Sequence, residues 1–410
     1  MKILMITHIL PYPPRGGCVQ RNFNLIKQVA EHHELHLVTF YRQSHLKPPE
    51  SLDDSIGAMR QYCKELHVFP IPSEHSRLKY FKTLFLNLFS SEPYSSAIYR
   101  SSGFKSKIIE MIGRYDYDVV EIGEIGLLNY ARLASDIPKL LVHHNIESQL
   151  LYRRAKVASN PLVQFYIKLQ AYRTARFEQR AGDLIECHTT CSETDREILL
   201  KINPAVKAIV VPNGVDTDFF KSTREEVEPN SLIFVGGLSW LPNRDAMMFF
   251  INDIWPILKQ EIPNIKMTVV GGSPPNELTT LSKKDSNFLV TGFVEDIRSL
   301  ISRAAIYVVP IRVGGGTRLK ILDAMSMGKA IVSHPIGAEG ISVTDGKDIV
   351  IAESAKEITA KIVDLLQNPE RRRQIEIHAR QTAENIYDWR KIAPVLLRAY
   401  TELAALKGKP

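Results

Sequence analysis

One glycine-rich segment carries the residue types needed to bind an anionic ligand. After an apolar run that ends at Pro310, three glycines at 314–316 open the backbone, and a helix is expected to begin near Thr317. Free N–H groups at that helix start, together with Arg318, which can bond phosphate oxygens bidentately, form a site for a diphosphate. Asp323 follows five residues beyond Arg318, and its carboxylate could accept hydrogen bonds from vicinal hydroxyls such as those of a ribose. The segment therefore predicts a site for a nucleoside diphosphate.

A glycine pair also follows the first apolar run of the chain. Gly16 and Gly17 open a predicted helix over residues 17–31, where backbone N–H groups and the helix dipole favour an anion. The segment does not match the G-x-G-x-x-G pattern, and no acidic residue ends the second predicted strand, so a nicotinamide cofactor is not indicated. A plain turn is the alternative explanation of this pair.

Short apolar runs alternate with helical stretches along the whole sequence, which is typical of an α/β fold with parallel sheets. The pattern restarts after residues 227–230, so we expect two Rossmann-like, doubly wound domains joined between Pro212 and Asn230. The predicted first domain covers residues 1–212, and a C-terminal amphipathic helix at 388–406 is expected to pack on it. The predicted second domain covers residues 228–387. Ligands of such sheets bind beyond the carboxyl ends of the strands, so the two domains are expected to face each other across a cleft.

Strands are predicted in both domains from these apolar runs. In the first domain they are 3–6, 35–40, 66–69, 119–122, 140–143 and 185–189, and in the second 231–235, 266–270, 288–290, 306–310, 330–333 and 349–351.

Composition limits the class of protein. The 410 residues are 44% hydrophobic and 24% charged, which describes a folded globular protein rather than a disordered or fibrous one. No apolar run reaches about eighteen residues, so no membrane-spanning helix is expected. The 4 cysteines are too scattered for a disulfide framework, which indicates a reducing, cytoplasmic location. The histidines at 32, 33 and 36 are expected at a helix end rather than in a metal site.

The net charge of +7 is unevenly distributed along the chain. Basic residues dominate 60–107 and 153–180, where they suit a phosphate-bearing ligand, nucleic acid or an anionic membrane, or form solvated helix faces without a partner. Within the first stretch an apolar stripe at helical spacing is flanked by two lysines: Phe81, Leu84, Phe85 and Leu88, with Lys79 and Lys82. This stripe is predicted either to contact an anionic membrane or to pack into the core of the first domain.

Several motifs together carry a family resemblance. They are Gly16-Gly17, His143-His144-Asn145-Ile146-Glu147, Ser192-Glu193-Thr194-Asp195, Val211-Pro212-Asn213-Gly214-Val215-Asp216, Phe234-Val235-Gly236-Gly237, Pro242-Asn243-Arg244-Asp245, Thr291-Gly292-Phe293-Val294 and Gly314-Gly315-Gly316-Thr317-Arg318-Leu319-Lys320. Over nearly its whole length the sequence resembles the retaining family 4 glycosyltransferases of the GT-B fold. It is most similar to a bacterial subgroup whose members act in exopolysaccharide or envelope-glycan assembly. The motifs are specific as a set, although each alone is weak.

The resemblance implies that the second domain holds most of a nucleotide-sugar donor. Asp323 takes the place of a family glutamate that binds the ribose hydroxyls, and Phe293 and Val294 lie where the backbone meets the base. From the first domain, Gly16 and Gly17 would close on the diphosphate. The other donor-binding positions implied are Gly236, Gly237, Arg244, Gly315, Gly316, Thr317, Leu319 and Lys320.

His144 matches the family histidine near the transferred sugar. A lone histidine is more often a structural residue, but its neighbours Asn145 and Glu147 also match and favour a functional role. The resemblance therefore makes His144, Arg318 and Asp323 the predicted catalytic residues.

The sequence departs from the family at three places. Gly315 stands where the first of two family glutamates, eight positions before Asp323, would contact the donor sugar. Asp323 is one methylene shorter than the second glutamate. An arginine and a lysine that bind phosphate in many members are replaced by Gly237 and Pro242. The available substitutes are Arg244, Arg318 and Lys320, of which Arg318 is expected to act first.

The expected activity is transfer of a sugar to an acceptor hydroxyl with retention, without a cofactor or an obligatory metal. The expected partners are a nucleotide-sugar donor and a glycan or lipid-linked glycan acceptor, not nucleic acid. The expected location is the cytoplasm, at or near the inner face of the membrane. Glu121 and Glu124 follow a strand and are candidate acceptor-binding carboxylates.

Two other functions remain open. A nucleotide-sugar epimerase on the same architecture would need a crowded carboxylate site, and Gly315 argues against one. A non-catalytic nucleotide-sugar-binding protein is consistent with the missing glutamate. The presence of His144, Asp323 and Arg318 together favours catalysis.

Overall fold

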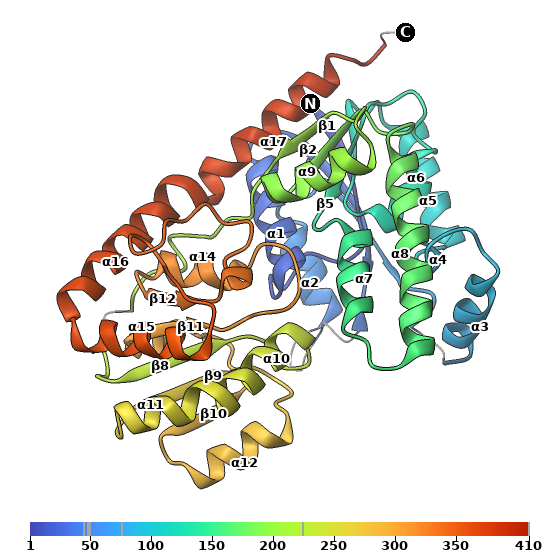
Figure 1. Ribbon diagram of the computed structural model, residues 1–410. Helices are drawn as coiled ribbons and strands as arrows, with labels where there is room; N and C mark the ends of the chain where they lie inside the picture. Colours follow the sequence, from blue (N-terminus) through green and yellow to red (C-terminus); the bar gives the residue numbers. More distant parts are fainter. Residues whose placement is uncertain (44–45, 47–50, 75–76, 224, 409–410) are drawn as a thin grey trace. The chain divides into compact units, whose positions relative to one another are not determined.

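The chain forms two compact units, each built on one parallel sheet. The computed structural model describes residues 1–43, 46, 51–74, 77–223 and 225–408 (Figure 1). The first unit comprises Met1–Pro212 and Ile392–Pro410, and the second comprises Asn213–Lys391. Both sheets show the strand order of a doubly wound α/β fold, so the predicted fold class is confirmed.

The first unit contains a seven-stranded sheet in the order β3-β2-β1-β4-β5-β6-β7. Its central strands are buried and mostly apolar, because helices cover both faces of the sheet (Figure 1). Chain order reverses between β1 and β4, which makes their carboxyl ends the switch point of the sheet. The strands are β1 (Lys2–Thr7), β2 (Glu34–Tyr41), β3 (Glu65–Pro70), β4 (Val119–Ile122), β5 (Lys139–His143), β6 (Cys187–Thr190) and β7 (Ala208–Val210).

The helices of the first unit pack on this sheet through large buried side chains. Phe104 stacks on Phe40 of β2 with ring centroids 4.0 Å apart. Ser192 caps the helix that follows β6, because its side chain accepts a hydrogen bond from the Asp195 N–H. The helices are α1 (Gly17–Ala30), α2 (Leu52–Met59), α3 (Arg77–Leu88), α4 (Tyr94–Ala97), α5 (Ser102–Arg114), α6 (Leu128–Ala131), α7 (Glu147–Lys156), α8 (Pro161–Ala181), α9 (Glu193–Ile202) and most of α17 (Trp389–Ala404).

The second unit contains a six-stranded sheet in the order β10-β9-β8-β11-β12-β13. Its switch point lies between β8 and β11, whose register pairs Tyr307 with Ile233. The strands are β8 (Ser231–Val235), β9 (Lys266–Val270), β10 (Phe288–Gly292), β11 (Ile306–Val309), β12 (Ala330–Ser333) and β13 (Val350–Ile351).

The two ends of the second unit meet in the fold. Val215 forms a parallel bridge with Asp388, and its N–H donates to the Tyr387 carbonyl at 2.8 Å. Residues 371–373 precede the predicted C-terminal helix and lie within α16. The helices are α10 (Leu241–Phe249), α11 (Trp255–Glu261), α12 (Asn276–Lys284), α13 (Arg298–Arg303), α14 (Leu319–Ser326), α15 (Ala355–Gln367) and α16 (Pro369–Thr382).

Candidate active site

The carboxyl ends of β8 and β11 bring two glycine-containing loops to the same edge of the second sheet. Gly236 and Gly237 follow β8 directly, and the loop at 310–318 follows β11. Chain order reverses between these two strands, and ligands of doubly wound sheets bind beyond the carboxyl ends of the strands at such a point. Most of the predicted donor-binding residues of the second unit lie in these two loops or in the helices that follow them.

Lys320 is the cation placed beside the β8 loop. Its Nζ donates to Asn243 Oδ1 at 2.8 Å and lies 4.1 Å from the centroid of the Phe234 ring. Asn243 in turn donates from Nδ2 to the Gly237 carbonyl at 2.8 Å. Burial, and then the charge of Arg318, hold the pKa of Lys320 well below its usual value. A diphosphate at this loop would supply the negative charge that favours the protonated lysine.

Gly236 is a glycine because of how closely these side chains approach its backbone. A Cβ at this position would lie 2.5 Å from Lys320 Nζ and 2.6 Å from Asn243 Nδ2. A Cβ at Gly237, in contrast, would meet no heavy atom within 4 Å. Only the first of the two glycines is required for packing.

Arg318 braces its own loop. It is the N-cap of α14, with an extended backbone, because the helix begins at Leu319 rather than near Thr317. Its side chain is buried, donates from Nη1 to the Gly315 carbonyl, and lies with Cζ 5.2 Å from the centroid of the Trp240 ring. The guanidinium therefore holds the glycine loop in shape and lies between it and the β8 loop.

Asp323 lies in the second turn of α14 and is buried. Burial, and then the charge of Asp323, raise the pKa of the Tyr307 hydroxyl on β11 well above its usual value. Leu319 points into the hydrophobic core of the second unit, so only its backbone could reach a ligand. Thr317 places a buried hydroxyl at the start of the helix, and the structure shows no hydrogen-bond partner for it among the described residues.

The remaining donor-binding predictions lie on two further segments. Phe293 follows β10 and is half exposed, while Val294 packs against the core. Arg244 is exposed on α10, where its N–H donates to the Trp240 carbonyl at 3.1 Å. Gly316 has a φ of 77°, a backbone conformation that favours glycine.

In the first unit, the switch point places a histidine beside a carboxylate. His8 follows β1 and Glu124 follows β4, and His8 Nδ1 lies 2.9 Å from Glu124 Oε2. Burial lowers the pKa of His8, but the Glu124 carboxylate and a hydrogen bond with Cys18 more than compensate and raise it to about 10. His8 is therefore protonated at neutral pH.

His144 lies next to this ion pair. Its ring centroid is 5.8 Å from that of His8. Burial, and then the positive charges of His8 and Arg21, hold the pKa of His144 well below its usual value, so the imidazole is neutral. A neutral imidazole can both donate and accept a hydrogen bond, which suits contact with a sugar hydroxyl.

Two further carboxyl groups follow His144. Burial, and then the charges of Glu124 and Glu178, raise the pKa of Glu147 to about 7. Burial also raises the pKa of Glu178 to about 7, although Ser148 donates to that carboxylate from both its N–H and its hydroxyl. These bonds fasten the start of α7, and with it Glu147, to α8.

The predicted anion site at Gly16 and Gly17 lies at the same switch point. Gly16 is the N-cap of α1 with a φ of 90°, and both glycines are exposed. Cys18, in the first turn of α1, bonds to His8 and so connects this helix start to the histidine pair.

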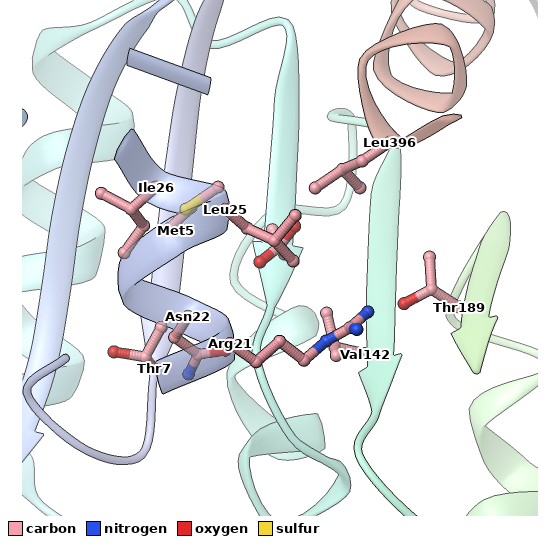
Figure 2. A pocket seen from close by; sticks show the side chains of 10 residues that line it. Met5, Thr7, Arg21, Asn22, Leu25, Ile26, Val142, Thr189 and Leu396 are labelled. Atoms are coloured by element: carbon pink, nitrogen blue, oxygen red, sulfur yellow. The ribbon is translucent and has the colours of Figure 1, made fainter. Parts of the chain in front are cut away.

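The two candidate acceptor-binding carboxylates, Glu121 and Glu124, lie in different environments. Glu124 lies in the site, whereas Glu121 is buried beneath it and accepts a hydrogen bond from Tyr400 of α17. Glu121 lines a small cavity with Arg21 and Leu396, which has room for about one water molecule (Figure 2). Figure 2 shows the Arg21 side chain extending from α1 across this cavity, and its Nη1 donates to the Pro212 carbonyl at 2.7 Å. Glu121 is therefore part of the packing that holds α17.

Sequence reasoning missed His8 as a site residue. The signal was its position directly after the first buried strand, one strand away from Glu124 in the sheet. The described residues contain no group of three His, Cys, Asp or Glu side chains arranged to hold a metal ion. In the described part of the chain, no helix has both the length and the apolar composition needed to cross a membrane.

Comparisons with known proteins match both units. Residues 15–219 match the family described as Glycosyltransferase Family 4, and residues 229–368 match that described as Glycosyl transferases group 1. An uncharacterized 44.6 kDa protein in the cps region of Klebsiella pneumoniae is 22% identical over 407 residues, which cover 95% of this chain and 97% of that protein.

Two solved structures resemble the whole chain. Sucrose-phosphate synthase from Thermosynechococcus elongatus has a TM-score of 0.71 at 15% identity, covering 99% of this chain and 100% of that one. HepE from Anabaena, in complex with UDP-glucose, has a TM-score of 0.63 at 13% identity, covering 98% of this chain and 100% of that one. These likenesses confirm the two-domain GT-B fold. With a family match that spans half of its residues, the chain belongs to glycosyltransferase family 4.

Proposed function

We propose that this glycosyltransferase moves a sugar from a nucleotide-diphosphate sugar to an acceptor hydroxyl with retention of anomeric configuration. The observation that supports the proposal is the second unit's switch point, where the glycine loop leads directly into the helix that carries Lys320 and Asp323. This combination provides a cation and backbone N–H groups for a diphosphate and a carboxylate for a ribose. HepE, a structural neighbour, was crystallised with UDP-glucose, which makes UDP sugars the first donors to test.

Within this proposal the second unit binds the nucleoside diphosphate. Asp323 accepts hydrogen bonds from the ribose hydroxyls, and the backbone at Phe293 and Val294 meets the base. Lys320 and the N–H groups of α14 neutralise the diphosphate, with Arg318 holding their loop. Gly315 leaves space without a side chain where the donor sugar would lie, so specificity for that sugar comes from other residues.

The first unit supplies groups for the sugar and the acceptor. His144 is neutral and hydrogen-bonds a hydroxyl of the transferred sugar, while protonated His8 contributes positive charge nearby. In the reaction the acceptor oxygen bonds to the anomeric carbon on the face from which the diphosphate leaves. The acceptor proton passes to the departing phosphate oxygen. Preorganised cations that stabilise charge on the leaving group account for catalysis without a nucleophilic side chain.

We also propose that no divalent metal is obligatory, because Lys320 and the helix start supply the positive charge that a metal would otherwise provide. Activity retained in excess EDTA would support this point. Recovery of lost activity on adding Mg²⁺ or Mn²⁺ would contradict it.

The acceptor we propose is a glycan or lipid-linked glycan of the cell envelope or an exopolysaccharide, used at the cytoplasmic face of the membrane. The resemblance to the bacterial envelope-glycan subgroup supports it, as does the relative named for the cps region of Klebsiella pneumoniae. Contact with an anionic membrane is then peripheral.

A thermal-shift screen with UDP, GDP, dTDP, ADP and CMP sugars tests donor binding. A ligand at about a hundred times its dissociation constant adds about 2.7 kcal/mol to the free energy of unfolding. The stabilising donor is then incubated with lipid-extracted acceptors, and NMR of the product gives the anomeric configuration. Inversion, or conversion of the donor sugar without any acceptor, would contradict the proposal.

A further inference from the structure

In the described part of the first unit, α3 exposes several large apolar side chains. Its outward face carries Leu78, Phe81, Phe85 and, just beyond its end, Phe89, with 78, 61, 60 and 79% of each residue exposed. Leu84 is partly buried and Asn87 is buried, so the opposite face packs on the protein. The alternative that this stripe packs into the core is therefore wrong for most of its members. A monomeric protein rarely exposes a contiguous apolar patch of this kind without a partner.

α8 lies against the end of α3 and exposes apolar side chains of its own. Arg173 donates from Nη1 to the Asn87 carbonyl at 2.8 Å and from Nη2 to the Leu88 carbonyl at 2.9 Å, which holds the end of α3 against α8. Figure 1 shows α3 lying beside α8. The first two turns of α8 expose further apolar side chains, among them Leu162 at 80% and Phe165 at 70%. We call the six apolar residues on or next to these two helices that are at least 60% exposed the α3–α8 surface: Leu78, Phe81, Phe85, Phe89, Leu162 and Phe165.

The charge around the α3–α8 surface has one sign. Residues 77–91 include three Lys or Arg and no Asp or Glu. Residues 148–177 include six Lys or Arg and again no acidic residue. Exposed aromatic rings flanked by lysines are the pattern of a helix that lies in the interface of an anionic bilayer. A second copy of the same surface would place like charges opposite each other, and protein interfaces are depleted in lysine.

We propose that the α3–α8 surface docks the enzyme onto anionic lipid, with the aromatic and leucine side chains entering the interface and the basic residues meeting the headgroups. The helix pair is joined to the candidate site through α7, which begins at Glu147 and is fastened to α8 by Ser148 and Glu178. Docking would therefore bring the segment that carries His144 to a lipid-linked acceptor. This last step rests on the proposed function, whereas the docking itself does not.

Co-sedimentation with vesicles tests the docking. The vesicles are phosphatidylcholine alone, or phosphatidylcholine with phosphatidylglycerol at about one part in four. We expect binding to the anionic vesicles only, weakened by added salt as the attraction is screened. Phe81→Ser with Phe85→Ser, and separately Lys79→Glu with Lys82→Glu, should each reduce binding at least about tenfold. All four side chains are exposed, so these changes leave the core intact.

Matched controls come from exposed helices of the second unit. Lys283→Glu with Lys284→Glu on α12 makes the same charge change elsewhere, and Ile377→Ser on α16 removes an exposed apolar side chain. Both should bind vesicles as the unaltered protein does. Equal binding to both vesicle types, no binding to either, or equal losses in the controls would overturn the proposal. So would an oligomer in light scattering that Phe81→Ser with Phe85→Ser dissociates, because it would assign the surface to self-association.

The outcome can be separated from that of the proposed function. UDP affinity of the two double variants on α3 is measured by calorimetry, and it should stay unchanged because these substitutions lie in the first unit, whereas the nucleotide is proposed to bind in the second. Vesicle binding in a protein that transfers no sugar would leave the docking in place and remove the proposed function. Sugar transfer by a protein that binds no vesicle would contradict the docking and leave the proposed function in place.

Discussion

His8 Nδ1 and Glu124 Oε2 lie 2.9 Å apart at the point where the strand order of the first sheet reverses. Each residue directly follows its strand, β1 or β4, and these two strands are hydrogen-bonded neighbours. The pair therefore results from topology, since 115 residues of sequence separate its members. It places one positive charge beside the neutral ring of His144.

This pair predicts a pH dependence of stability. The pKa of His8 is about 10 in the fold against 6.5 ordinarily, so the folded chain retains a proton that the unfolded chain loses. The stabilisation is complete below pH 6.5 and is lost as the pH rises through 10. Melting temperatures measured from pH 6 to 10 should fall more steeply for the unaltered protein than for Glu124→Gln. Parallel curves would contradict the assignment.

Gly236→Ala should destabilise the protein, whereas Gly237→Ala should not. The added Cβ at 236 would displace Lys320 Nζ and Asn243 Nδ2 and break the hydrogen bonds that they make, each of which contributes about 0.5–1.5 kcal/mol. Thermal unfolding of the two variants without ligand is the measurement. A lower melting temperature for Gly237→Ala than for Gly236→Ala would show that the loop is packed differently.

Lys320 should couple nucleotide binding to proton uptake. The pKa of Lys320 is lowered in the protein without ligand, and a bound diphosphate favours the charged form and so raises this pKa. At a pH between the pKa of the free protein and that of the complex, binding therefore takes up a proton. UDP affinity should then fall as the pH rises through that interval. Calorimetry in buffers of different ionisation enthalpy measures the proton directly. Lys320→Met should abolish the uptake, and uptake that persists in this variant would assign it to another group.

Asp323→Ala should weaken binding of the free nucleoside diphosphate about tenfold to a hundredfold, the range expected for hydrogen bonds to a charged group. Asp323→Glu is the matched variant, because it keeps the carboxylate and adds one methylene, and it should bind nearly as the unaltered protein does. Calorimetry with UDP compares them. Equal affinity in all three proteins would place the ribose elsewhere.

Arg318→Ala should reduce turnover about tenfold to a hundredfold with little change in folding. Arg318→Lys tells whether charge or loop bracing matters, since lysine cannot reproduce the planar guanidinium that bonds the Gly315 carbonyl. Turnover retained in Arg318→Lys would indicate that the positive charge matters. A loss equal to that of Arg318→Ala would indicate that the hydrogen bond to the loop matters. Near-normal turnover in folded Arg318→Ala would remove Arg318 from the site.

The sheet positions were predictable from sequence because buried parallel strands are continuous apolar runs. β7 was missed although residues 208–211 are an apolar run, because the strand Ala208–Val210 is only three residues long and partly buried. The glycine loops were predictable too, since their residue types carry the signal themselves. The glycine motifs did not show that Lys320 is the cation that lies at the β8 loop.

Which of Arg318 and Lys320 reaches the β8 loop depends on where α14 begins, and the observed start differs by two residues from the predicted one. With α14 beginning at Leu319, Arg318 has extended backbone and turns back onto its loop, while Lys320 is in the first turn and reaches Asn243. Helix starts are the least certain part of a sequence prediction, and so are contacts that depend on them. The pairing of His8 with Glu124 requires the strand order, which no local pattern contains.

The meeting of Val215 and Asp388 has a consequence for dissecting this enzyme. Because the bridge closes residues 213–391 at both ends, the second unit is an insertion into the first rather than an appendage to it. The second unit is a single continuous segment of the chain, so one fragment, residues 213–391, contains all of it. The first unit can be made from one chain only by splicing residues 212 and 392 across a short linker. A fragment that simply stops at Pro212 loses Tyr400 and leaves the buried Glu121 carboxyl without its hydrogen-bond donor.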